Sequence, residues 1–183
     1  MVKIPVKVVW IKDINNHVHP SIMIAMNEVV SDFGKVDYDS IKRFNKEYNE
    51  VISDCKEVLK VYKKKGRIQP IGYWKVGFIL NNFVEQKESD FKFTNYRIAF
   101  QKDLVISDSY IGVIMDFPKF FEEREIVNEV KMSYYFELLL KARALFGVGK
   151  FNAEKKKLVR LEREGKLPDH KTYRQMLKET LRN

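Results

Sequence analysis

Residues 95–117 read NYRIAFQKDLVISDSYIGVIMDF, a pattern that predicts two short helices joined by a tight turn. Thr94 is a suitable N-cap for the first helix, and Ser107 is one for the second. The apolar side chains recur at the spacing of a buried helical face; they are Tyr96, Phe100, Leu104, Ile111 and Ile114. A helix-turn-helix-like unit at 94–117 is typical of nucleic-acid-binding domains, so the rest of the chain is arranged around it.

A longer amphipathic helix is expected before this unit. From Ile41 to Tyr62, apolar residues follow one another at alternating spacings of three and four, which is a heptad pattern. Asp39 would cap this helix, and Gly66 would end it after Lys65. The apolar stripe suits either packing on the chain's own core or the seam of a homodimer. We favour packing within the chain, because further apolar side chains widen the stripe beyond a bare seam.

The remaining patterns complete the prediction of the fold. Alternating apolar residues at 2–10 predict a short edge strand, and Pro118 is expected to stop or kink one helix at Phe117 and to begin another. Gly147 and Gly149 predict a boundary before two further helices. The sequence therefore indicates a mainly α-helical protein with a small N-terminal β element, a core domain of residues 1–146 and a basic helical tail of residues 147–183.

The charge of the chain is concentrated in this tail. The formal net charge is +9, and the tail holds eleven Lys and Arg against five Asp and Glu. Such a segment attracts nucleic acid, an acidic membrane surface or an acidic protein, although a solvated helical face has the same composition. No apolar run reaches the ~18 residues that span a bilayer, and the start of the chain lacks the hydrophobic block of a signal peptide. We expect a cytoplasmic protein without a membrane partner, in which the single cysteine, Cys55, is a buried free thiol.

Three pieces of sequence, taken in order, resemble a known family. They are YWKVG at 73–77, the helix pair from Tyr96 to Pro118, and SYYFELL at 133–139. They are similar to elements of the N-terminal, winged-helix-type domain of YhcG-like proteins, over about residues 50–145. The resemblance implies a DNA-associated domain of the sort found near mobile elements and restriction systems. The PD-(D/E)XK nuclease domain that usually follows in this family has no counterpart after residue 145.

The second helix of the pair departs from the family pattern. Where the family tends to carry arginine and asparagine, this chain has Asp108, Ser109, Gly112, Val113 and Asp116. Carboxylates on that face would be repelled by a phosphate backbone, so we do not expect this helix to read bases.

Catalytic and metal-binding patterns are weak. Two acid-x-lysine pairs, Glu85 with Lys87 and Glu129 with Lys131, have the spacing found in PD-(D/E)XK sites but no preceding strand that would supply a second acid. Asp13, His17 and His19 could ligate a metal if they lay on a strand, although adjacent histidines in a turn are more often exposed. We expect no enzyme activity, no metal and no cofactor.

The remaining candidates are residues that could contact phosphate. Cations on the first tail helix could follow a phosphate track, and the helix pair could add further contacts. The predicted nucleic-acid-binding residues are Lys155, Lys156, Lys157, Arg160, Arg163, Arg97, Lys102, Ser107 and Ser109. The leading hypothesis is a non-enzymatic protein that binds duplex DNA mainly through its phosphates. The alternatives are a protein-interaction or oligomerisation module that uses the 41–62 helix and, less favoured, an RNA-binding protein or a metal-dependent nuclease.

Overall fold

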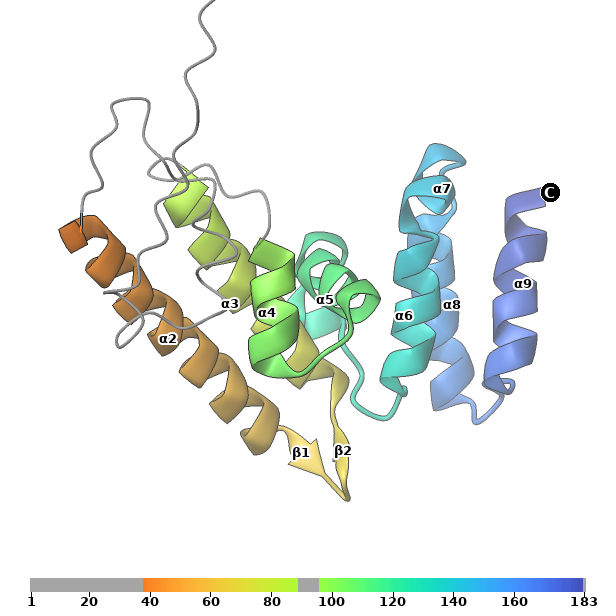
Figure 1. The fold of residues 1–183 in the computed structure, drawn as a ribbon. Coiled ribbons are helices and arrows are strands. Elements are labelled where there is room, and N and C mark those ends of the chain that lie inside the picture. Colours follow the sequence, from red (N-terminus) through yellow and green to blue (C-terminus); the bar gives the residue numbers. More distant parts are fainter. Residues whose placement is uncertain (1–37, 89–95, 183) are drawn as a thin grey trace, which may run out of the picture.

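Helices make up most of the part of the chain that the structure describes, and a small two-stranded sheet lies among them, as Figure 1 shows. The computed structural model describes residues 38–88 and 96–182. The elements are α2 (Tyr38–Val61), β1 (Lys63–Lys64), β2 (Arg67–Ile68), α3 (Pro70–Glu88), α4 (Tyr96–Leu104), α5 (Asp108–Phe120), the short 3-10 helix η2 (Glu123–Glu125), α6 (Met132–Leu140), α7 (Ala142–Gly147), α8 (Phe151–Arg163) and α9 (His170–Arg182). The predicted mainly helical fold with a small β element is confirmed. The strand predicted at 2–10 lies outside the described residues, and the sheet that is described lies at 63–68.

The heptad stripe of α2 packs on the chain's own core. Phe44, Tyr48 and Cys55 are buried among side chains of α3, α4 and α5. The ring of Tyr48 stacks on Phe100 with 5.9 Å between centroids, and its hydroxyl donates a 2.6 Å hydrogen bond to the Asp103 carboxylate. These three stripe residues are therefore occupied within the chain and are not free to form a homodimer seam.

The end of α2 differs from the prediction. The helix stops at Val61, and Lys63 to Ile68 form a two-stranded antiparallel hairpin in place of a last helical turn. The two central residues of the turn, Lys65 and Gly66, have φ values of 49° and 76°. Positive φ at both positions is the geometry of a tight two-residue hairpin turn, which a helix cannot continue through.

Helices α3 and α5 approach one another closely at Gly77. A Cβ atom on Gly77 would lie 1.9 Å from the carbonyl oxygen of Ile114 and 3.0 Å from Cδ of Pro118. Because Pro118 has no N–H, the Ile114 carbonyl lacks its usual partner one turn later in α5. Of the two predicted outcomes, a stop or a kink at Phe117, the stop does not occur, since α5 continues through Pro118 to Phe120. The Ile114 carbonyl, which has no helical N–H partner at Pro118, packs closely against Gly77 of α3.

Helix α5 joins two hydrophobic clusters. Ile111 and Ile114 lie in the first cluster with α2, α3 and α4, whereas Val113 and Phe117 lie in the second with α6, α8 and α9. Val113, which the sequence placed on an outward face, is only 5% exposed. Helix α5 is the second helix of the predicted helix-turn-helix-like unit, the position of a recognition helix. Neighbouring elements cover it on more than one side.

The basic tail is built into the second cluster. Phe151 and Leu158 of α8, and Tyr173 and Leu177 of α9, are buried there together with residues of α5 and α6. Buried Glu137 of α6 also faces α9, where the Arg174 side chain lies 3.4 Å away. Burial of apolar side chains thus packs α8 and α9 against α6, and the division at residue 147 stays a prediction.

Candidate nucleic-acid interface

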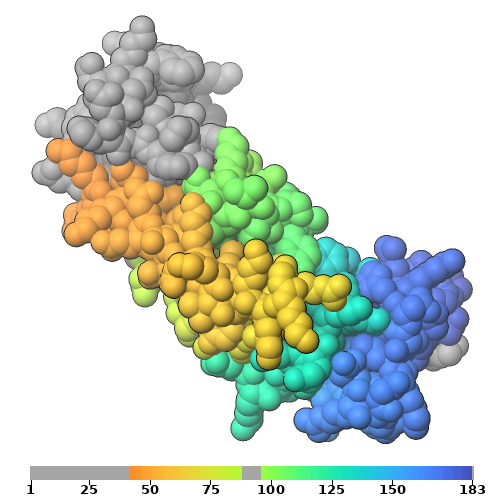
Figure 2. All heavy atoms as spheres, turned by 90° about the horizontal axis from the view of Figure 1, so that it is seen from below, coloured from red at the N-terminus to blue at the C-terminus, as the bar shows by residue number. Residues whose placement is uncertain are grey.

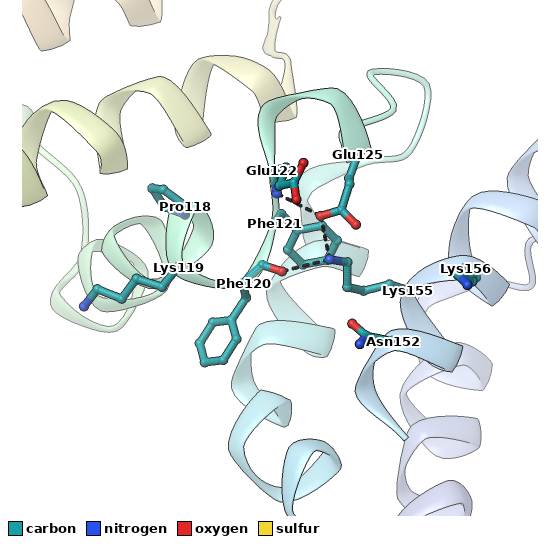
Figure 3. A pocket seen from close by; sticks show the side chains of 9 residues that line it. All are labelled: Pro118, Lys119, Phe120, Phe121, Glu122, Glu125, Asn152, Lys155 and Lys156. Carbon is teal, nitrogen blue, oxygen red and sulfur yellow. Dashed lines mark hydrogen bonds and ion pairs between the residues drawn. The ribbon is translucent and has the colours of Figure 1, made fainter. Parts of the chain in front are cut away.

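Lys155 of α8 is a buried structural cation. Its ammonium group donates a 2.6 Å hydrogen bond to the Glu125 carboxylate and a 2.9 Å hydrogen bond to the Phe120 carbonyl, and it lies 4.6 Å from the centre of the Phe121 ring (Figure 3). Partial burial acts to raise the pKa of Glu125, but the hydrogen bond from Lys155 and other favourable contacts hold it below its ordinary value. The sequence predicts that Lys155 contacts phosphate, but its ammonium group is mostly buried and already holds the Glu125 carboxylate and the Phe120 carbonyl.

A cavity of about 480 Å³ opens beside this ion pair, between the end of α5, η2 and α8. Its acidic groups are already engaged, because the side chains of Glu122 and Glu125 form a reciprocal capping box at η2, and Glu122 also pairs with Arg124 at 2.6 Å. No group of three His, Cys, Asp or Glu side chains suited to a metal occurs within residues 38–88 and 96–182. The candidate ligands Asp13, His17 and His19 lie outside those residues.

The two acid-x-lysine pairs do not form a site with each other. Glu85 and Lys87 lie in α3, where Lys87 forms an ion pair with Glu47 of α2. Glu129 and Lys131 lie in the exposed segment before α6. Neither pair stands on a strand, as the nuclease arrangement would require.

The other predicted residues of α8 differ in their availability. Lys157 pairs with Glu154 at 3.2 Å, and Arg160 lies 4.0 Å from Glu164. Lys156 and Arg163 are exposed and have no acidic partner among the residues that the structure describes. The predicted phosphate track on α8 is therefore reduced to these two free cations.

The residues predicted on the helix pair are exposed but belong to the other half of the molecule. Arg97 and Lys102 extend from α4, and the hydroxyl oxygens of Ser107 and Ser109 lie 3.5 Å apart before and within the first turn of α5. Helices α4 and α8 are separated by α5 and α6 (Figure 1). The nine predicted residues thus do not line one continuous surface.

Several elements that carry exposed cations reach the lower side of the molecule in Figure 1. The hairpin projects there, and the start of α6, the end of α8 and the start of α9 reach the same side; Figure 2 views this side from below. We call it the basic side. Its exposed cations have no acidic partner within the described parts of the chain; they are Lys63, Lys64, Lys65, Arg67, Lys131, Arg163 and Lys171.

Two acidic residues on the basic side are engaged by neighbouring groups. Glu164 pairs with Lys166 at 3.1 Å, and the Asp169 carboxylate accepts hydrogen bonds from the first turn of α9. Hydrogen bonds from the Thr172 hydroxyl and backbone hold the pKa of Asp169 below its ordinary value. The sequence predicts only Arg163 from this set as a contact, because the lysines at 63–65 fit the charged end of a helix.

Comparison with known proteins returned no match to a family model, to a curated protein or to a solved structure. The resemblance to YhcG-like N-terminal domains stays a prediction. None of the helices within residues 38–88 and 96–182 has the length and apolar character needed to cross a membrane.

Proposed function

We propose that the protein is a non-enzymatic DNA-binding or DNA-associated accessory protein that contacts the phosphate backbone of duplex DNA. The observation that carries this proposal is the basic side, which the hairpin and the ends of three helices reach together and where exposed cations have no acidic partner in the described parts of the chain. Duplex DNA is a dense and extended polyanion, and each cation that neutralises a phosphate releases counterions and adds to the binding free energy. Cations distributed over several elements match an extended ligand better than a small anion.

The expected binding does not depend on base sequence. Base readout needs an element that enters a groove with side chains free to reach base edges. Helix α5, the second helix of the helix-turn-helix-like unit, instead buries Ile111, Ile114 and Phe117 between its neighbours. Contacts to phosphate position a protein on DNA without reading sequence, so the basic side supports a backbone-binding role.

The proposal is tested by titrating labelled duplex DNA with the full chain over a series of salt concentrations. Binding is expected at low salt, and it should weaken linearly in a plot of log affinity against log salt. Arg163→Glu combined with Lys171→Glu should reduce affinity. The matched control is Arg143→Glu combined with Lys178→Glu, which reverses two exposed cations of α7 and α9. Absence of binding by the unmodified protein at the lowest salt would overturn the proposal.

The main alternative, an interaction module built on the 41–62 helix, has less support. Phe44, Tyr48 and Cys55 on that helix are buried in the chain's own first cluster. Light scattering over a range of protein concentrations would reveal a dimer formed through any other surface.

A further inference from the structure

We propose that the β1–β2 hairpin is a phosphate-binding arm and makes the principal contact between this protein and duplex DNA. This inference rests on the proposed function and assigns it to a particular element. The sequence predicts the charged end of a helix at 63–65, whereas the structure has a hairpin there. Four of the five residues from 63 to 67 are lysine or arginine, and all five are exposed.

The arrangement of these cations opposes the stability of the hairpin. Lys64 and Arg67 are directly opposite each other in the antiparallel register, and like charges in that position destabilise a strand pair. Lys65 has a φ of 49°, a backbone conformation that glycine and asparagine adopt more readily than lysine. A hairpin that served only to connect α2 and α3 would be more stable with other residues at all three positions. A bound polyanion would neutralise the repulsion between these cations, which explains why they are present in the hairpin.

The base of the hairpin is held firmly while its tip extends. The Gln69 N–H donates a 2.9 Å hydrogen bond to the Tyr62 carbonyl, which continues the strand pairing below the turn. A Cβ atom on Gly72 would lie 2.7 Å from Cβ of Tyr62, so the first turn of α3 packs directly on the hairpin base. Because the arm is fixed at its base, less conformational entropy is lost when its side chains bind a ligand.

The two faces of the ribbon differ in what they can contact. Residues directly opposite each other in a hairpin share one face, so Lys63 and Ile68 lie together, and Lys64 and Arg67 lie together on the other face. Ile68 reaches toward α3, where its Cγ2 atom would lie 3.2 Å from a Cβ on Gly72. Lys64 and Arg67 therefore face away from α3. Because both cations lie on the outer face of the ribbon, they can contact successive phosphates of the DNA backbone without reading bases.

The decisive variant replaces Lys64 and Arg67 with threonine. The two substitutions remove the cross-strand repulsion and introduce a residue that favours strands, so the melting temperature should stay the same or rise. The affinity for duplex DNA should fall roughly ten- to hundredfold at about 100 mM salt, and the slope of log affinity against log salt should decrease in magnitude by about 1.8. Loss of affinity without loss of stability separates a binding role from a structural one.

Lys65→Asn provides a second measurement. Asparagine is well suited to the positive φ at this position, so the variant should be more stable than the unmodified protein while the salt slope decreases by about 0.9. The matched control, Arg143→Gln with Lys178→Gln, removes two exposed cations from α7 and α9 and should leave the slope unchanged.

The outcomes distinguish this inference from the proposed function. If the unmodified protein binds DNA and Lys64→Thr with Arg67→Thr has the same slope and affinity, the hairpin is not the contact and the proposed function stands on the other elements. If the unmodified protein does not bind at the lowest salt, both are overturned.

Discussion

At the scale of single residues, Lys155 illustrates how a cation can serve the fold. We expect Lys155→Met to lower the free energy of unfolding by about 1–3 kcal/mol, because it leaves the Glu125 carboxylate without its closest donor. The loss is smaller than for a fully buried pair, since Glu125 is 37% exposed and water screens it. Urea unfolding would measure the change. The neighbouring Lys156→Met has no ion pair to break and should stay within about 0.5 kcal/mol of the unmodified protein.

Part of the role of Lys155 was predictable from sequence. Phe151 and Leu158 are seven residues apart, and Lys155 lies between them at the spacing of one helical face, so it falls on the buried stripe of α8. Its partner Glu125 was not predictable, since it lies 30 residues away in the sequence. A run of three lysines therefore contains one structural residue, one paired residue and one free residue, and only tertiary contacts separate them.

Val105 occupies a position that glycine would suit better. Its φ is 56° and its side chain is 89% exposed, at the turn where the Ile106 N–H donates a 3.1 Å hydrogen bond to the Gln101 carbonyl. A left-handed conformation costs an L-residue roughly 1–2 kcal/mol, which exceeds the entropy that glycine adds to the unfolded chain. Val105→Gly should therefore raise the free energy of unfolding by about 0.5–1 kcal/mol in urea titrations. Val105→Ala retains Cβ, and an equal gain from it would contradict this explanation.

At the scale of elements, replacing two glycines with alanine should change the stability in opposite directions. Gly77→Ala should cost about 3 kcal/mol or more, because the new methyl group meets the Ile114 carbonyl of α5, and neither helix can retreat without opening the core. Gly112→Ala should instead stabilise by roughly 0.5–1 kcal/mol, since alanine favours the helix and the nearest atom to its Cβ is the flexible end of Arg97 at 3.5 Å. Thermal unfolding of both variants measures the difference. Similar effects at the two positions would show that α3 and α5 are not in close contact at Gly77.

The hairpin marks the limit of what the sequence predicts about elements. Helical periodicity predicted α2 because it extends over many residues. Lysines followed by glycine at 63–66 fit the end of a helix as well as a turn, since cations and glycine are favoured at helix C-termini. An Asn-Gly or Asp-Gly pair is typical of a two-residue hairpin turn. Here Lys65 occupies the first of the two turn positions, before Gly66. In the structure Tyr62 packs against Gly72, a contact that the local pattern at 63–66 does not encode.

At the scale of the whole molecule, alkaline pH should weaken both hydrophobic clusters. Burial raises the pKa of Cys55 in the first cluster to about 12, and burial raises that of Tyr135 in the second to about 12, from ordinary values of 9.0 and 10.0. Each group stabilises the fold while it is neutral, and this contribution is fully present below the pKa that the group has in the unfolded protein. It is lost as the pH rises from that value toward the higher pKa of the folded protein. The free energy of unfolding should fall by ~1.4 kcal/mol per pH unit for each group in this range.

Cys55→Ala isolates the thiol in this experiment. The variant removes one titrating group, so its stability should decline less steeply above pH ~9 than that of the unmodified protein, whatever its stability at neutral pH. Urea midpoints measured at closely spaced pH values give the slope. If both proteins lose stability equally between pH ~9 and ~10, the buried thiol does not contribute as expected.

The two clusters should also unfold together, because α5 supplies side chains to both. Leu177→Ala in α9 should cost about 2–5 kcal/mol from lost burial and an unfilled cavity. In native-state hydrogen exchange, Leu177→Ala should lower the opening free energy of the slowest amides equally in α2 and in α9. This is expected although α2 does not contribute to the second cluster. Leu80→Ala in the first cluster gives the reciprocal measurement. If Leu177→Ala affects only α6 to α9, the second cluster unfolds as a separate unit, and the division of the chain lies at α5 instead of at residue 147.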